Sequence, residues 1–176
     1  MPRRSACALV ALSFVQLFSS VAFAQIADAI SVASLSGLKA FYVSIGDLNA
    51  EVRQAGLTAA QLRTDIELKF REAGIGIIPQ PAWIDTIGGA ELYVEANALK
   101  HGGGQYSYCI QISVIQKASL STKPTHETLA TTWSSSVMGV VGSTSAATKI
   151  RGEVGAETDR FVGGYLSANP PVGKRE

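Results

Sequence analysis

Histidine and cysteine side chains are the usual protein ligands for a transition metal, and this sequence contains few of them. Its two histidines, His101 and His126, lie in separate predicted turns, and Cys109 lies on the predicted strand between them. A closed zinc site takes four nitrogen or sulfur ligands, which these three side chains do not supply at these spacings. We therefore predict neither a metal site nor a cofactor.

Nucleophilic catalysis has one sequence match, the S-x-x-K pattern of Ser36–Lys39. That pattern acts when serine and lysine share one face of a helix, whereas this segment precedes a predicted strand. The accompanying S-D-N and K-T-G motifs and the G-x-S-x-G elbow are absent from the sequence. Gly102–Gly104 also precedes a strand, so it predicts a hairpin turn rather than a phosphate-binding loop. We therefore predict that the protein is not an enzyme.

Alternation of apolar and polar residues marks the strands that must carry any binding surface. The expected strands are residues 38–45, 75–78, 91–100, 106–118 and about 128–140. Turns over 101–105 and 120–127 are expected to join the last three strands. Such alternation is typical of an antiparallel sheet with one covered face and one wetter face.

Two amphipathic helices are expected to cover that sheet. The first begins at a capping box formed by Thr58 and Gln61, in which each side chain satisfies a backbone N–H of the first turn. Its apolar stripe recurs at helical spacing through Leu62, Ile66 and Phe70. The second helix is expected over about 145–168, before the prolines at 170 and 171.

These elements predict an α+β fold: a mostly antiparallel sheet of about five strands with two amphipathic helices on one face, in the order β-α-β-β-β-β-α. A helix separates strands 38–45 and 75–78, so a parallel crossover is expected there. The remaining strands should form a meander. Both helices should cover the face that carries Tyr106, Ile110 and Val114.

The opposite face of the sheet is the candidate interaction surface. Asn97, Gln111 and Ser113 are expected to lie on it, among other small polar side chains. The facing of Trp133 is open: the residue is either a binding anchor among these polar groups or a member of the core. Cys109 is a lone thiol with two readings: a small strand residue, or a group that forms an intermolecular bridge or acts as a reactive thiol.

The first residues of the chain, 1–24, have the pattern of a cleavable signal peptide. Arg3 and Arg4 precede an uncharged, mostly apolar run, and small residues precede a cleavage position near Ala24/Gln25. The apolar run is short for a membrane span and contains serine and glutamine. We therefore predict a periplasmic or secreted protein, with no transmembrane span in the mature chain.

The rest of the chain is interpreted as a flexible leader over 25–37, a single α+β domain over 38–169 and a tail over 170–176. The formal net charge of the whole sequence is +1, and cleavage of the signal peptide would remove two arginines. A nearly neutral domain lacks the basic surface that nucleic-acid binding requires. No nucleic-acid partner is therefore expected.

Several motifs resemble those of a family of small exported bacterial proteins with no assigned activity. The motifs are Gly56–Thr58 with Gln61–Asp65, Glu91–Val94, Ala130–Trp133 and Phe161–Pro170. The order of elements is also similar to that of small α+β periplasmic domains such as the amino-terminal domain of the Tol–Pal propeller protein. Those domains act through protein contacts, so the resemblance implies binding rather than catalysis.

The sequence therefore predicts a non-catalytic protein-interaction or envelope-assembly module, whose partner is another envelope protein. The alternative is a carrier of a small molecule or lipid, with a cavity between the helices and the sheet. A closed core beside an exposed sheet edge would favour the interaction module. The sequence leaves the oligomeric state open.

Overall fold

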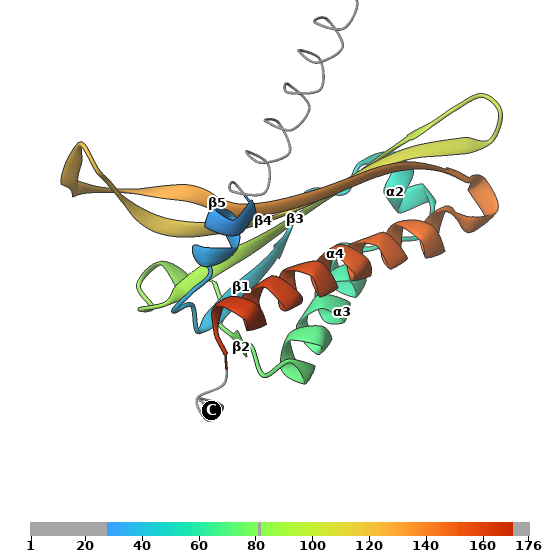
Figure 1. Ribbon diagram of the computed structural model, residues 1–176. Coiled ribbons are helices and arrows are strands. Elements are labelled where there is room, and N and C mark those ends of the chain that lie inside the picture. The colour runs from blue at the N-terminus through green and yellow to red at the C-terminus, as the bar shows by residue number, and fades with distance from the viewer. Residues whose placement is uncertain (1–27, 81, 171–176) are drawn as a thin grey trace, which may run out of the picture.

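The computed structural model describes residues 28–80 and 82–170 and has an α+β fold (Figure 1). The strands are β1 (Ala40–Ile45), β2 (Gly76–Ile77), β3 (Gly89–Lys100), β4 (Gln105–Leu120) and β5 (Lys123–Gly142). The labelled helices are α2 (Ala50–Gln54), α3 (Ala59–Glu72) and α4 (Ala146–Ala168). The predicted signal peptide (1–24), its cleavage position and residues 171–176 of the predicted tail lie outside the described residues.

The five strands form one sheet in the order β2-β1-β3-β4-β5. β1 pairs in parallel with β2 and with β3, whereas β3, β4 and β5 form an antiparallel meander. The parallel crossover through α3 and the meander are confirmed. The prediction of a mostly antiparallel sheet is largely confirmed by the long β3–β4 and β4–β5 ladders. The sheet is nevertheless mixed, because the chain returns from β2 across β1 and places β3 on its far side, parallel to β1.

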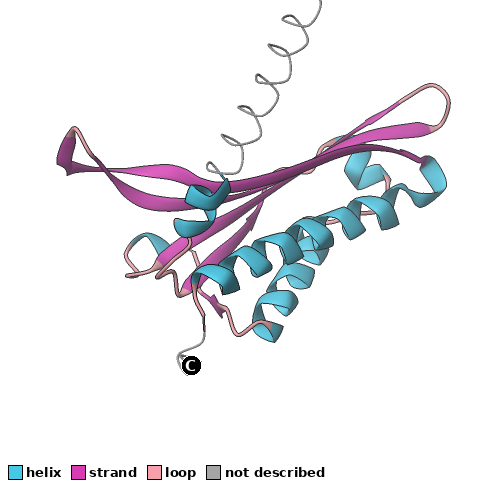
Figure 2. Cartoon of the chain, in the orientation of Figure 1, coloured by secondary structure: helices cyan, strands magenta, loops and turns pink. Residues whose placement is uncertain are grey.

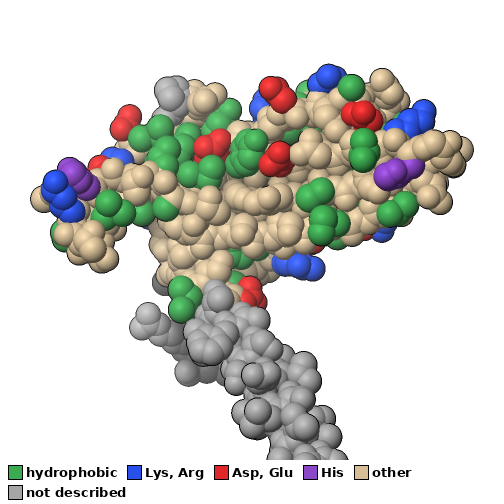
Figure 3. Space-filling model, turned by 90° about the horizontal axis from the view of Figure 1, so that it is seen from above, with side chains coloured by type: hydrophobic (Ala, Val, Ile, Leu, Met, Phe, Trp, Pro, Cys, Tyr) green, Lys and Arg blue, Asp and Glu red, His purple; other side chains and the backbone are tan. Residues whose placement is uncertain are grey.

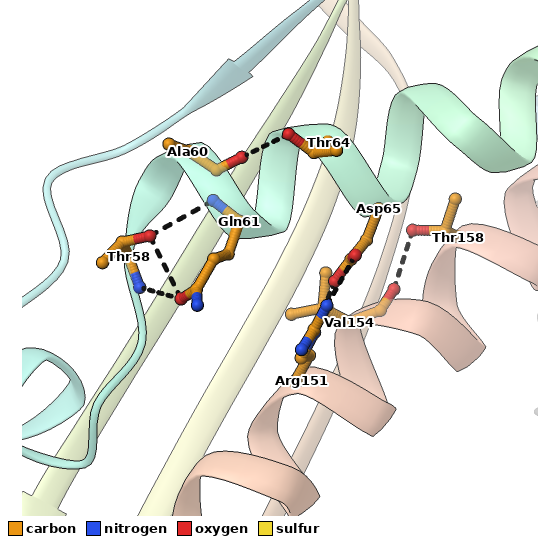
Figure 4. A network of polar contacts seen from close by, with 8 residues as sticks. All are labelled: Thr58, Ala60, Gln61, Thr64, Asp65, Arg151, Val154 and Thr158. Carbon is orange, nitrogen blue, oxygen red and sulfur yellow. Dashed lines mark hydrogen bonds and ion pairs between the residues drawn. The ribbon is translucent and has the colours of Figure 1, made fainter.

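α3 begins where the sequence predicts, at a capping box. The Thr58 hydroxyl accepts the Gln61 backbone N–H at 3.2 Å, and the Gln61 side-chain oxygen accepts the Thr58 backbone N–H at 3.1 Å (Figure 4). The stripe through Leu62, Ile66 and Phe70 is buried. Such a box satisfies two N–H groups that would otherwise lack partners at the start of the helix.

Both long helices cover the same face of the sheet, as predicted (Figure 2). Between them and the strands lies an aromatic cluster in which the Phe41 ring is 5.6 Å from Phe70 and 5.2 Å from Phe161. All three side chains are fully buried. Each contributes about 1.5–3 kcal/mol by burial alone, so this cluster is the centre of the core.

An ion pair joins the exposed sides of α3 and α4 (Figure 4). The Arg151 guanidinium donates to both carboxylate oxygens of Asp65, at 2.6 and 2.8 Å. These hydrogen bonds hold the pKa of the Asp65 carboxyl below its ordinary value. The pair links the two helices where they lie side by side over the sheet.

The segment expected to be a flexible leader is packed against the domain over residues 28–37. Residues 28–33 form a short helix, and the Leu35 side chain is fully buried in the core. The Ser31 and Ser34 hydroxyls donate to the Thr132 carbonyl at 3.2 and 3.1 Å. The part of the leader that the structure describes therefore belongs to the folded domain, and Leu35 is the apolar residue that anchors it.

β5 is longer than expected and contains a bulge. It begins at Lys123 and includes Pro124, where a longer turn was predicted; proline is tolerated because β5 is an edge strand. Val114 opposes Trp133, whereas the next residue of β4, Ile115, opposes Thr131. Thr132 is therefore an extra residue, and Thr131 and Trp133 point to opposite faces of the sheet.

Candidate interaction surface on the uncovered sheet face

The face of the sheet that α3 and α4 leave open, which we call the uncovered face, is built by alternate residues of the three long strands. The residues between them point toward the helices, and those of β3 and β4 are buried in the core. The uncovered face carries Tyr93, Glu95, Asn97 and Leu99 from β3; Ser107, Cys109, Gln111 and Ser113 from β4; and Ser134, Ser136, Met138 and Val140 from β5. Figure 3, seen from above, shows hydrophobic side chains among polar ones on this side.

The middle of the uncovered face is polar and internally hydrogen-bonded. The Asn97 side-chain amide donates to Glu95 at 2.9 Å, and the Gln111 amide donates to the Ser113 hydroxyl at 3.3 Å. Gln111 is exposed, but Ser113 has only 5% of its surface exposed. Asn97, Gln111 and Ser113 therefore share the predicted face, while Ser113 offers a partner little surface.

Trp133 does not lie on this face. It is buried on the side of the helices, where its ring stands edge-on to Phe161 at 5.4 Å. The bulge at Thr132 determines this facing, because it reverses the alternation between Thr131 and Trp133. The reading of Trp133 as a binding anchor is wrong, and the alternative reading as a core residue is confirmed.

One end of the uncovered face is apolar. Leu99, Met138 and Val140 are all exposed, and Met138 has 79% of its surface open. The exposed thiol of Cys109 lies on the same rows, since Cys109 opposes Asn97 on one side and Met138 on the other. We call Leu99, Cys109, Met138 and Val140 the apolar patch; they line a shallow depression of about 520 Å³.

Gly139 of β5 leaves room for the Tyr108 side chain on the core side of this patch. It opposes Tyr108, and a β carbon at Gly139 would collide with the Tyr108 hydroxyl. That hydroxyl instead reaches Glu153 of α4 at 3.4 Å. Burial, and then the neighbouring Glu153 carboxylate, raise the pKa of Tyr108 above its ordinary value. Tyr108 therefore stays neutral and supports β5 from the core side.

The sequence did not identify Leu99, Met138 and Val140 as surface residues. The run Val137–Val141 is almost entirely apolar, and such a run is typical of a strand buried on both faces. The alternation would have been the signal. Met138 and Val140 lie an even number of residues after the polar Ser134 and Ser136, so all four side chains point to the same face of the strand.

The His101 ring nitrogen lies 2.7 Å from the Ser107 hydroxyl. Within residues 28–80 and 82–170, no three His, Cys, Asp or Glu side chains are grouped to hold a metal ion. None of the helices described there has the length and apolar character needed to cross a membrane. Comparison with models of known protein families and with curated proteins gives no match.

Proposed function

We propose that the protein is an exported, non-catalytic interaction module that binds another envelope protein through the uncovered face. The observation that carries this proposal is the apolar patch beside a polar, exposed strand surface. Exposed apolar side chains that gather on one surface favour a contact that removes them from water. Asn97 and Gln111 would supply the polar rim of that contact, which is the usual arrangement around an apolar interface centre.

The packing of the interior favours this function over that of a carrier. A carrier requires space between the helices and the sheet. That space holds the rings of Phe41, Phe70 and Phe161, together with Trp133 and Tyr165, at centroid distances of 5.2–6.2 Å. The larger depressions of the described residues lie on the surface instead, one of them at the apolar patch.

Crosslinking in the native envelope, followed by mass spectrometry, tests the proposal. The test variant is Leu99→Arg with Gln111→Arg, because both positions are exposed on the uncovered face and lie on inner strands. Two long cationic side chains there would block a partner's approach while leaving the core intact. The matched control is Leu68→Arg, an exposed leucine on α3, on the other side of the sheet.

We expect the double variant to fold, as judged by its circular dichroism spectrum, and to lose crosslinks to a partner that the parent and the Leu68→Arg control both retain. Retention of every parent crosslink by the folded double variant would exclude the uncovered face as the binding surface. Loss of the crosslinks in the Leu68→Arg control alone would place the surface on the helices.

A further inference from the structure

We propose that β5 pairs antiparallel with β5 of a second copy of the chain, around a two-fold axis at Met138, so that two sheets join into one. This interface uses the free edge of the sheet, whereas the envelope partner proposed above uses its face. The proposal rests on the direction of the β5 backbone groups, the protection of β2 and of the first part of β5, and the position of the apolar patch.

The hydrogen-bond register shows which backbone groups of β5 point outward. The Ser143 N–H donates to the Gly104 carbonyl at 2.9 Å, at the point where the β4–β5 ladder ends. In an antiparallel ladder, hydrogen-bonded and non-bonded pairs alternate. The residues that direct N–H and C=O away from β4 are therefore Ser134, Ser136, Met138, Val140 and Gly142. The Thr132 carbonyl also points outward, since it accepts from Ser31 and Ser34.

β2 and the first part of β5, which are also edge segments of the sheet, are protected in ways that discourage strand pairing. β2, at the opposite edge, has two residues and is followed closely by Pro79. The first part of β5 carries Lys123, Pro124 and Glu127. The N-terminal segment then occupies the Thr132 carbonyl. Short strands, prolines, charges and covering segments are the common protections of sheet edges.

The stretch from Ser134 to Gly142 has none of these protections. It contains no charged residue and no proline, and its outward N–H and C=O groups have no hydrogen-bond partner among the described residues. Met138 is the midpoint of this stretch. Antiparallel pairing around Met138 therefore uses its whole length and opposes no like charges across the interface.

The side chains favour the same register. A two-fold axis at Met138 places the two Met138 side chains against each other, with Val140 of each copy opposite Ser136 of the other. The apolar patches of both copies then become continuous on the uncovered face of the joined sheet. The most exposed hydrophobic side chain of the uncovered face, Met138, thereby gains an apolar neighbour on the side of the second copy.

The uncharged stretch is complementary to itself, which favours a second copy as the occupant. Rotation about Met138 brings Ser134 opposite Gly142 and Ser136 opposite Val140. The same residues then serve on both sides of the contact, as an isologous interface requires.

Engineered disulfides test the register in protein produced from the full chain. The Cys109→Ser background is needed because Cys109 opposes residue 138 within one chain. In that background, Met138→Cys should give a covalent dimer under mild copper–phenanthroline oxidation, since hydrogen-bonded antiparallel pairs lie about 5.5 Å apart between α carbons. Ser136→Cys is the matched control: its copies would lie about 14 Å apart along the strands, so it should stay monomeric on a non-reducing gel.

A charge-swap experiment tests the interface without a covalent bond. Light scattering coupled to size exclusion should give twice the chain mass for the parent and the single chain mass for Met138→Lys and Met138→Glu, each folded by circular dichroism. Mixing the two variants should restore the double mass, because opposite charges then meet at the axis. A parent that is monomeric throughout, or variants that all remain dimeric, would overturn the proposal.

The two proposals can fail separately. The Leu99→Arg, Gln111→Arg variant should remain dimeric, because neither residue lies on β5. Loss of its envelope crosslinks with the dimer intact supports the envelope-binding proposal whatever the Met138 variants show. Strong crosslinking of Ser136→Cys, but not of Met138→Cys, would contradict the axis at Met138 and leave the envelope-binding proposal untouched.

Discussion

Replacing Trp133 with alanine removes the largest side chain that β5 contributes to the core. The residue lies on the helix-covered face only because the Thr132 bulge reverses the alternation of β5. Its ring packs edge-on against Phe161, 5.4 Å away. The substitution therefore tests the facing of β5 and, with it, which residues make up the uncovered face.

The cost follows from the buried area and the space left behind. A tryptophan of this kind buries roughly 200 Å², which at about 25 cal/mol per Å² corresponds to about 5 kcal/mol. Alanine keeps part of that burial, and partial collapse of the site reduces the loss, so we expect a decrease of about 3–5 kcal/mol in the free energy of unfolding. That decrease is a large fraction of the stability of an ordinary domain.

Urea unfolding followed by far-ultraviolet circular dichroism measures this decrease. Circular dichroism is preferable to fluorescence, since the variant retains Trp83 as its single tryptophan. The matched control is Ser134→Ala, the next residue on the opposite face, which should change stability by less than about 0.5 kcal/mol. A larger loss for Ser134→Ala than for Trp133→Ala would mean that Trp133 does not face the helices and that the β5 register is wrong.

Three further substitutions test other parts of the structure by the same unfolding measurement. Ile110→Ala should cost about 2–5 kcal/mol, because the side chain is fully buried beneath the helices; a loss near zero would contradict that burial. Cys109→Ser should change stability by less than about 0.5 kcal/mol, since the thiol is exposed; a loss of several kcal/mol would show it to be buried. Asp65→Asn should cost about 0.2–1 kcal/mol near neutral pH by removing the partly exposed pair with Arg151. Because the folded-state pKa of Asp65 lies below its ordinary value of 3.8, this stabilisation is present above that value and is lost as pH falls through the folded pKa. If the parent remained more stable than Asp65→Asn at lower pH, the result would contradict the pairing.

Local features of the fold were predictable from the sequence. The capping box at Thr58 and Gln61, and the stripe through Ile66, depend on contacts within a few residues. The alternation through Ile110 identified the core face of β4. In each case the physical cause lies in neighbouring residues, so the pattern alone was sufficient.

Features that depend on distant contacts were not predictable in the same way. Alternation identifies β3 as a strand but contains no information that β1 is its parallel neighbour. The burial of Leu35 depends on contact with the distant C-terminal part of α4, where a β carbon at Gly164 would lie 3.7 Å from a Leu35 methyl group. The facing of Trp133 depends on one extra residue in β5, and a bulge leaves the local composition unchanged. The apolar patch was missed for a related reason, because exposure of Met138 depends on the helices covering only one face.

The reactivity of Cys109 in the native envelope tests the proposed binding surface most directly. This thiol is exposed in the structure and lies within the apolar patch, so a bound partner must cover it. We predict that a maleimide reagent labels Cys109 rapidly in the purified protein and much more slowly in intact envelopes. A cysteine placed on α3 by Leu68→Cys, in the Cys109→Ser background, should react equally in both settings. Equal labelling of Cys109 in the purified protein and in the envelope would contradict binding through the uncovered face.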